Sequence, residues 1–537
     1  MSEEEKPVAV AATGGGRAAR PSLELVVNDG QRLDDLDKRG GPGGAPPTGG
    51  DIGDPASVVP VPASDDALAV ELSRALGADW RCGMPGSEWY EWDTQRWVGE
   101  RTQRVFDISR QVCRRYAAEY DLADKLGREV SSTGKAYAAV KFAAADRSHA
   151  TPLGDFDRDP WRINTPSGII DLRSGQRQDH ERDALMSKIA AAGPEGECPT
   201  WRRFLREATG DDDELAGFLQ RWAGYCLTGL TDEQVFVFLH GKPGTGKSTY
   251  QKTLRKLVGD YGLTAEMETF IVAKGERHPT ELAQFVGRRL IVANETDEGR
   301  FWNESRLCGI VDGTPINAHF MRQDNFEFVP QAKLLFAGNH RPRLRSGRGG
   351  LRRRLLLVTL NHKPKRVDPH LEEKLDAELG GILKWAIEGE VLRQRLGLRP
   401  PQAVLAATRA YFRAEDTIGR WIDERCVRGP NERALPAQLY RDFLSWAATV
   451  GEFWRPSLKM FSEALDEVAG IERGYVDLGR DATGKRQQSP QGYRGLSLRY
   501  GDAELPLDTP RRARGTGRVE GDFLPGGDDP AEDWPRE

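Results

Sequence analysis

The sequence predicts an α/β protein whose central part is built on a parallel sheet. Three apolar segments read as buried strands: 235–239, 290–293 and the stretch AKLLFAG at 332–338. The first strand runs into a glycine-rich turn and then into a basic helix that begins near Ser248. Buried strands that are joined through helices usually lie parallel in a sheet with both faces covered.

Smaller elements are expected before this centre. The segment EWYEWDTQRWVGE at 88–100 has the Trp and Tyr spacing of short paired strands, and 104–120 reads as an amphipathic helix. The stretch 161–176 predicts two more short strands. Two helices, each with its apolar residues on one face, are expected in 199–228. A small α+β region and a helical segment therefore precede the sheet.

The glycine-rich turn carries a phosphate-binding pattern, G-x4-G-K-[ST]. The residues that would bind a nucleotide are Gly241, Lys242, Pro243, Gly244, Thr245, Gly246, Lys247, Ser248 and Thr249. Glycines let backbone N–H groups approach phosphate oxygens, Lys247 would neutralise the β and γ oxygens, and the Ser248 hydroxyl would ligate Mg²⁺. The alternative is an ordinary glycine-rich turn. The strand, the Lys-Ser pair and the helix favour a site for a nucleoside triphosphate.

Polar residues follow the other two strands. Glu295 stands where a carboxylate is expected at the carboxyl edge of a parallel sheet, so it would polarise the attacking water and join Ser248 at Mg²⁺. Asp297 is better explained as a solvated loop acid. Asn339 ends the third strand and could position water against the γ-phosphate, although asparagine at a strand end is often only a turn former.

A predicted hairpin offers a place for nucleic acid. INAHFMRQDNFEFV reads as strands at 316–322 and 326–329 around a turn. His319, Phe320 and Arg322 would give a single strand the cations and aromatic faces that it needs. The alternative is an exposed hairpin with incidental polar residues.

A run of lysines and arginines without an intervening acid follows the third strand. Its members are Arg341, Arg343, Arg345, Arg348, Arg352, Arg353, Arg354, Lys363, Lys365 and Arg366. A solvated basic face is the usual explanation for such a run. Its start directly after Asn339 favours phosphate binding, which should weaken steeply with salt.

Near the end of the chain, 435–451 and 456–470 read as amphipathic helices and 492–500 as a strand and wing. Together they predict a winged-helix-like domain, an assignment that rests mainly on analogy.

Composition narrows the class of protein. The chain has 537 residues, too many for one core, and a formal net charge of −5, so nucleic-acid binding would have to come from local clusters. Its six cysteines show no CxxC spacing, which predicts reduced thiols and no zinc site. The acidic start MSEEEK and the lack of a long apolar run predict a cytoplasmic protein without a membrane anchor.

The ordered set Lys247-Ser248, Glu295 and GNH at 338–340 resembles the ATPase core of the superfamily 3 helicases. More specifically, it resembles the helicase part of phage and plasmid primase-helicases related to the poxvirus enzyme. The stretches FLHGKPGTGKST, GRRLIVANETDEG, LCGIVDGTPINAHF and GGLRRRLLLV carry the likeness, which spans roughly 85–500. The resemblance implies an AAA+-like P-loop ATPase core with a parallel sheet.

The same resemblance implies ATP and Mg²⁺ as cofactors and Lys247, Glu295 and Asn339 as catalytic residues. Arg353 or Arg354 falls at the arginine finger, which completes a neighbour's site. These arginines could instead decorate a sheet edge or bind DNA. The resemblance also implies a homo-oligomer, a hexameric ring, that moves 3′ to 5′ on single-stranded or forked DNA. A separate primase is a candidate partner, and the host cytoplasm is the expected location for a phage-encoded chain.

The chain departs from the family at two places. Family members usually carry Ser-Glu where this chain has Asn294-Glu295. They also carry Gly-Gly-Asp and later Ala-Arg where it has 311–314 (VDGT) and Ala318-His319. The second departure weakens the expectation of DNA contact more than that of ATP chemistry.

Three other functions are weighed against an ATP-dependent replicative DNA helicase. One is an AAA+ replication initiator or loader ATPase that binds origin DNA without processive unwinding. Another is a non-enzymatic, origin-binding initiator whose ATP site only drives assembly. The third is primer synthesis through Asp157 and Asp159, which is set aside because too few ordered residues precede this pair for a polymerase domain.

The predicted segments are a disordered Gly/Pro-rich tail at 1–65, an α+β region at 66–198, a helical segment at 199–230, the ATPase core at 231–366, a helical lid or linker at 367–400, a winged-helix-like DNA-binding domain at 401–505 and a disordered tail at 506–537.

Overall fold

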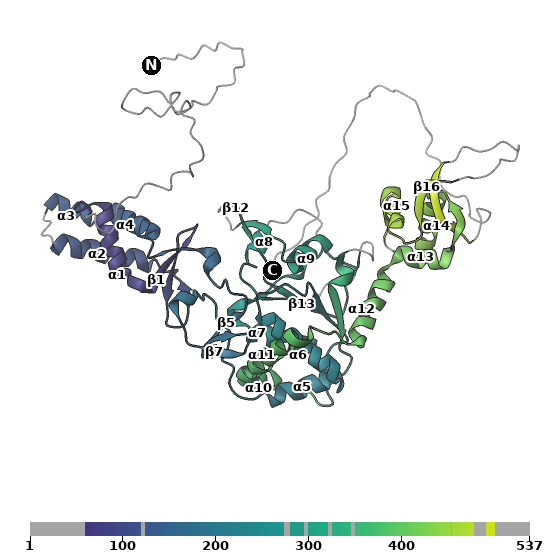
Figure 1. Cartoon of the computed structure of the whole chain (residues 1–537), viewed down its shortest axis with the longest axis horizontal. Coiled ribbons are helices and arrows are strands. Elements are labelled where there is room, and N and C mark those ends of the chain that lie inside the picture. The colour runs from purple at the N-terminus through teal and green to yellow at the C-terminus, as the bar shows by residue number, and fades with distance from the viewer. Residues whose placement is uncertain are drawn as a thin grey trace, which may run out of the picture. The chain divides into compact units, whose positions relative to one another are not determined.

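The computed structural model describes residues 60–119, 124–272, 280–294, 299–319, 325–344, 350–452, 454–476 and 490–499. The predicted tails fall almost wholly outside these residues. All elements discussed below belong to the unit Ala63–Glu537 (Figure 1).

The N-terminal region is an α+β unit, as predicted. Its elements are α1 (Asp65–Leu76), β1 (Trp80–Met84), β2 (Glu88–Trp92), β3 (Trp97–Gly99), α2 (Arg104–Glu119), α3 (Asp124–Val130), α4 (Thr133–Ala145) and β4 (Ala150–Pro152). The strands form a sheet in the order β3-β2-β1-β4. Leu68, Trp80 and Val112 belong to one buried cluster that joins the helices to this sheet. The paired strands expected in 88–100 and the helix expected in 104–120 are confirmed.

A three-stranded sheet and two helices lead to the central sheet. They are β5 (Arg162–Thr165), β6 (Gly168–Asp171), β7 (Gln176–Gln178), α5 (Pro199–Thr209) and α6 (Asp213–Leu227). The caps explain the helix ends, because Gly210 ends α5 in the left-handed region at φ 69° and Asp212 accepts a hydrogen bond from the Leu215 N–H at the start of α6.

The central sheet has five strands, all parallel, in the order β14-β8-β13-β10-β9. They are β8 (Phe236–His240), β9 (Gly262–Thr264), β10 (Leu290–Asn294), β13 (Lys333–Gly338) and β14 (Leu355–Thr359). The sequence predicts the three inner strands and misses the two edge strands. Both faces are buried, because alternate residues of one strand enter different clusters: Val237 and Leu239 on one side, Phe236 and Phe238 on the other.

Helices cover both faces of this sheet. The remaining elements of the core are α7 (Lys247–Leu257), α8 (Thr280–Ala283), α9 (Glu304–Val311), β11 (Ile316–His319), β12 (Asn325–Phe328), α10 (Leu371–Ala377), α11 (Leu379–Leu396) and α12 (Gln402–Glu415). Leu254 of α7 and Ile382 of α11 share a cluster with Val237, whereas Leu307 of α9 and Tyr411 of α12 share one with Phe236.

Helix α12 belongs with the sheet. The Thr408 hydroxyl accepts a hydrogen bond from the Leu357 N–H at 2.9 Å, and the Trp302 indole donates to the Tyr411 hydroxyl at 3.2 Å. The C-terminal domain is expected to begin at residue 401. Helix α12, which follows that position, packs on β14 of the central sheet instead.

The last described part has its own core. It comprises α13 (Thr417–Arg425), β15 (Cys426–Ala434), α14 (Pro436–Thr449), α15 (Leu458–Asp466), β16 (Glu472–Tyr475) and β17 (Gln491–Leu498), with antiparallel strands in the order β15-β17-β16. Trp421, Phe443 and Phe461 lie at its centre. The two helices and the strand expected in 435–500 are confirmed.

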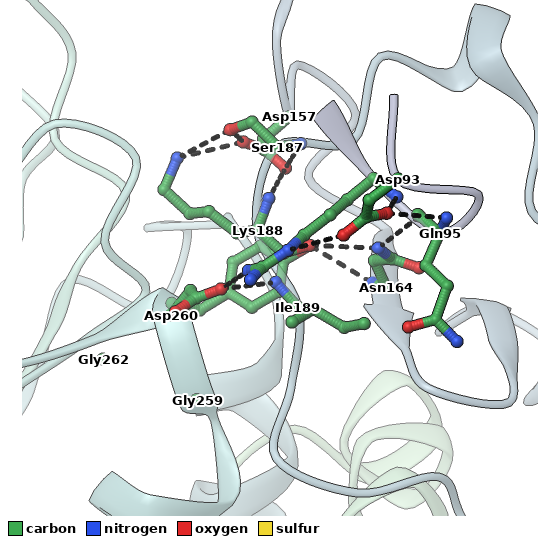
Figure 2. A network of polar contacts seen from close by, with 12 residues as sticks. Asp93, Gln95, Asp157, Asn164, Ser187, Lys188, Ile189, Gly259, Asp260 and Gly262 are labelled. Carbon is green, nitrogen blue, oxygen red and sulfur yellow. Dashed lines mark hydrogen bonds and ion pairs between the residues drawn. The ribbon is translucent and has the colours of Figure 1, made fainter. Parts of the chain in front are cut away.

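A polar network joins the N-terminal sheet to the turn that follows α7 (Figure 2). Arg96 forms ion pairs with Asp93, at 3.7 Å, and with Asp260. The Asn164 side-chain amide donates to the carbonyl oxygens of Gln95, at 3.0 Å, and Lys188, at 3.2 Å. The N-terminal strands are thus fixed to the core through main-chain as well as side-chain atoms.

Asp157 is the most buried acid of this network. It accepts hydrogen bonds from the Ser187 N–H at 3.0 Å and from the Lys188 ammonium at 2.9 Å. Burial alone would raise the pKa of Asp157, but the charge of Lys188 and the hydrogen bonds outweigh it and the pKa lies below its usual value. The carboxylate is therefore a charged structural anchor.

We expect Asp157→Asn to lower the free energy of unfolding by about 2 kcal/mol at pH 7, because Lys188 loses its partner. The folded pKa is depressed, so this stabilisation is present above about pH 4 and disappears as the pH falls through the folded value. Urea denaturation at several pH values measures the difference between wild type and variant.

The control for this prediction is Asp155→Asn, whose partner Arg158 lies at 3.4 Å on the surface. It should change stability by less than about 0.5 kcal/mol. A difference between wild type and Asp157→Asn that does not shrink as the pH is lowered below about 4 would contradict the assignment.

Candidate functional site

The glycine-rich turn lies at the carboxyl edge of the sheet, between β8 and α7. Gly241, Gly244 and Gly246 have φ values of 151°, 80° and 90°, a region that other residues avoid. A Cβ on Gly241 would lie 2.0 Å from the Leu360 carbonyl oxygen, and one on Gly246 would lie 2.9 Å from the Phe204 ring. Only glycine fits these two positions, so the turn passes close beneath its neighbours.

Helix α7 begins at Lys247, directly after this turn. The first N–H groups of a helix have no partner within it, and the helix dipole adds partial positive charge there. A turn of this kind that opens into a helix is a common anion site.

Two of the predicted catalytic residues, Lys247 and Asn339, are in direct contact. Its ammonium donates to the carbonyl oxygens of Gly241, at 2.6 Å, and Lys242, at 2.9 Å, and to Asn339 Oδ1, at 3.1 Å. Lys247 and Asn339 are 92 positions apart along the chain. They meet because β13 lies beside β8 in the parallel sheet, with Gly338 paired to His240.

The surroundings of this contact are electropositive. Burial lowers the pKa of His240, and the charges of Arg341 and Lys247 lower it further. The positive charges of Arg341 and Lys247 near His240 are what make these surroundings electropositive.

Other residues of the predicted phosphate site lie around the turn. Lys242, Pro243, Gly244 and Ser248 are exposed, Thr249 is half-buried, and the buried Thr245 hydroxyl donates to the Lys242 carbonyl oxygen at 2.9 Å. The Ser248 hydroxyl is therefore accessible in the first turn of α7.

The residues present can be compared with what Mg²⁺ needs. The ion takes oxygen ligands and is usually held by one or two carboxylates together with substrate phosphates. Ser248 offers one such oxygen at the turn. The predicted carboxylate, Glu295, lies outside the described residues, while Asn294 before it ends β10 beside Ala337 of β13. Of the two predicted ligands, the described residues therefore place only the Ser248 hydroxyl at the turn, and Mg²⁺ binding stays a prediction.

Arg353 and Arg354 have different surroundings. Arg354 is 5% exposed; its guanidinium donates to the two Asp312 carboxylate oxygens at 2.6 and 2.5 Å and to the Gly350 carbonyl oxygen at 2.5 Å. Arg353, in the short 3-10 helix Gly350–Arg353, is exposed. Arg354 is thus engaged within its own chain, and of the two only Arg353 presents its side chain to solvent. The sequence analysis did not identify Asp312 as the partner of Arg354.

Some members of the basic run have partners within the fold. Arg341 lies over the Tyr411 ring at 5.3 Å, and Arg343 forms an ion pair with Glu452 at 3.1 Å. Arg341 nevertheless remains exposed, as do Arg352, Arg353, Lys363, Lys365 and Arg366, whereas Arg345 and Arg348 lie outside the described residues. Part of the run therefore holds the fold together.

The predicted hairpin is confirmed by antiparallel pairing of β11 with β12, in which His319 faces Asn325. His319 is half-buried at the end of β11. Phe320 and Arg322 lie outside the described residues, so their part in DNA binding stays a prediction.

The acids weighed for primer synthesis have other partners. Asp157 is held by Ser187 and Lys188, as described above. Asp159 accepts a hydrogen bond from the Trp161 N–H at 2.9 Å and faces Arg162 at 3.4 Å. Within the described ranges, no group of three or more His, Cys, Asp or Glu side chains is placed to hold a metal ion.

The fold defines an α/β protein with a parallel sheet, and comparisons with known proteins narrow this class. Residues 70–210 match the family model described as D5 N terminal like. Residues 239–354 match a family of unknown function, DUF5906.

Two curated proteins are similar to parts of the chain. A putative helicase, L207/L206, of Acanthamoeba polyphaga mimivirus is 22% identical over 323 residues, which are 55% of this chain and 34% of the relative. The uncharacterized mitochondrial protein ymf21 of Marchantia polymorpha is 36% identical over 62 residues, 12% of this chain and 34% of that protein. The chain thus spans about a third of the length of these relatives.

Two solved structures of the NrS-1 C-terminal region are also similar. The A form of the apo structure has a TM-score of 0.43, and a second apo structure has 0.45. Each is 10% identical and covers 80% of this chain and 99% of the other. The D5 N-terminal match and the viral relative fit the resemblance to phage primase-helicases. They do not single out the superfamily 3 helicase part.

No helix in the described part of the chain combines the length and apolar character that a membrane span requires.

We expect Arg354→Ala to destabilise the protein by about 3 kcal/mol, because Asp312 loses a partner at a largely buried position. Arg353→Ala is the matched control and should change stability by less than about 0.5 kcal/mol. Thermal and urea unfolding of both variants measure this. Equal losses in the two variants would contradict the different roles assigned to the adjacent arginines.

Proposed function

We propose that this chain is an ATP-dependent replicative DNA helicase of the superfamily 3 type, encoded by a phage or related mobile element. The observation that supports it most is the contact of the Lys247 ammonium with Asn339, beside a turn of three left-handed glycines. The similarity of part of the chain to a putative viral helicase agrees with it.

In this proposal the AAA+-like core binds ATP at the turn between β8 and α7. The Lys247 ammonium exchanges its contacts with the turn's carbonyl oxygens for the β and γ oxygens of ATP. The Ser248 hydroxyl and Glu295 would hold Mg²⁺, which would supply positive charge against the phosphates. Glu295 polarises the attacking water, and Asn339, already in contact with Lys247, orients it against the γ-phosphate.

The proposal also includes the assembly and its DNA. Subunits form a ring, in the expected case a hexamer, and Arg353 stabilises charge in the neighbour's transition state. The hairpin of β11 and β12, with His319, Phe320 and Arg322, contacts a single strand and moves along it from 3′ to 5′. The C-terminal unit would serve as a winged-helix-like DNA-binding domain, and a separate primase is a candidate partner.

A second candidate function is an AAA+ initiator or loader that binds origin DNA without processive unwinding. The observation that favours it is the C-terminal unit, whose separate core of Trp421, Phe443 and Phe461 suits an independent DNA-binding module. Strand displacement on forked DNA separates the two functions, since a loader would hydrolyse ATP without displacing a strand.

We expect ATP hydrolysis that is stimulated by single-stranded DNA and unwinding of forks with a free 3′ tail. Lys247→Ala should abolish ATP binding, whereas Asn339→Ala should keep binding and reduce kcat at least about tenfold, because water positioning acts in the transition state. Nucleotide titration and steady-state hydrolysis measure both effects.

Lys252→Ala is the control for these variants. Lys252 lies on the same helix but pairs with Glu372 on the surface at 3.0 Å, so its loss should leave binding and turnover unchanged. Unaltered hydrolysis in Lys247→Ala would rule out the proposed ATP site.

Mixed assemblies test whether Arg353 acts on a neighbour. Arg353→Ala alone should bind ATP but lose roughly 10³-fold or more in hydrolysis, and Lys247→Ala alone should be inactive. A one-to-one mixture pairs an intact ATP site with an intact finger at about a quarter of its interfaces, so activity should return. Hydrolysis that stays absent in the mixture would show that Arg353 does not serve a neighbouring site.

A further inference from the structure

Gln251 ties the helix that carries Lys247 to two neighbouring strands. It lies one turn beyond Lys247 on α7 and is 1% exposed. Its side-chain amide donates to the carbonyl oxygens of Ala293 in β10, at 3.0 Å, and Leu335 in β13, at 2.8 Å. One amide group therefore bridges the helix to the main chains of both strands.

The bridge is close to the carboxyl edge of the sheet. Ala293 is followed by Asn294, the last residue of β10, and Leu335 lies four positions before Asn339. Because both acceptors are main-chain atoms, the two bonds fix the position of α7 relative to the strands whatever the strand side chains are. The ends of β10 and β13 therefore keep a set distance from the start of α7.

Packing alone does not account for a glutamine here. Leu254, on the same helix, is buried in an apolar cluster. The Gln251 Oε1 atom is buried and has no hydrogen-bond partner in the described part of the chain. A buried acceptor without a partner destabilises a protein, and leucine would fill similar space without this cost. The two amide bonds are what glutamine provides and leucine does not.

We propose that Gln251 is a positioning residue for nucleotide hydrolysis. By holding α7 against β10 and β13, it keeps Lys247 and Asn339 at the spacing in which both can act on the γ-phosphate. The inference rests on the proposed function. A misplacement of about 1 Å at reacting groups can cost about 10²-fold in rate, so a lost bridge should be visible in turnover.

The central experiment compares Gln251→Leu with Tyr250→Phe in the full chain. Tyr250 is the adjacent residue and is equally buried, but its hydroxyl donates to the Leu219 carbonyl oxygen of α6, at 2.8 Å, away from the strands. Both changes remove buried hydrogen bonds from the same helix. Steady-state ATP hydrolysis and thermal unfolding are measured for each.

For Gln251→Leu we expect a kcat lower by about 10- to 100-fold and a KM for ATP within about threefold of wild type. Tyr250→Phe should lower the unfolding temperature without lowering kcat. Gln251→Glu adds a pH readout. A protonated carboxyl group can donate a hydrogen bond to one of the two carbonyl oxygens. The kcat of Gln251→Glu, divided by that of Gln251→Leu, should therefore rise as the pH falls.

Each outcome bears on the inference. An equal kcat in Gln251→Leu and Tyr250→Phe, or a pH-independent ratio between the Glu and Leu variants, would show that Gln251 only fills the core. If wild type hydrolyses ATP and Gln251→Leu has the same kcat, this inference is wrong but the proposed function stands. If wild type and Lys247→Ala both fail to hydrolyse ATP, the proposed function fails and the inference fails with it.

Discussion

The parallel pairing of β8 with β13 and β14 is the constraint on which the candidate site depends. His240 at the end of β8 is paired with Gly338 on one side and with Thr359 on the other. The residues that leave the three strands, Gly241, Asn339 and Leu360, therefore emerge at the same level of the sheet. A shift of one strand by one residue would turn Asn339 away from Lys247 and move the Leu360 carbonyl oxygen from its place over Gly241.

Buried cations at the two ends of the sheet have different surroundings. At the amino end, the Lys333 ammonium donates to the carbonyl oxygens of Leu230, at 3.1 Å, and Gln331, at 2.9 Å, and burial lowers the pKa of Lys333 to about 7. Those acceptors are main-chain atoms of loops that connect secondary-structure elements, so Lys333 has a structural role at that end of the sheet. Lys247 also rests on carbonyl oxygens, but they belong to a turn with exposed residues at its tip. Lys247 therefore lies close to exposed residues, whereas Lys333 is enclosed.

Sequence reasoning found what local patterns encode and missed what distant partners create. The inner strands β8, β10 and β13 were predictable because each is an apolar run buried on both faces. The edge strand β9 has three residues, and β14 lies within the basic run, between Arg354 and Lys363, which obscures it. The pairing of Arg354 with Asp312 joins residues 42 positions apart, and no spacing rule along the chain reveals such a pair. Gln251 could have been noticed, since a polar residue four positions after Lys247 must face the same side of α7.

Helix α7 is held at three levels, and this is why the candidate site can be stiff. At its start, Lys247 contacts the turn and Asn339. One turn later, Gln251 bonds to the main chains of β10 and β13. After its end, the Tyr261 hydroxyl accepts a hydrogen bond from the Asn164 N–H at 3.2 Å, and Asp260 pairs with Arg96 of the N-terminal region. An α-helix of 11 residues is about 16 Å long and moves as a rigid body. A displacement of the turn would therefore also shift the contacts with the strands and with the N-terminal network. The N-terminal region thus helps to fix the position of the candidate site, although none of the site residues described above belongs to it.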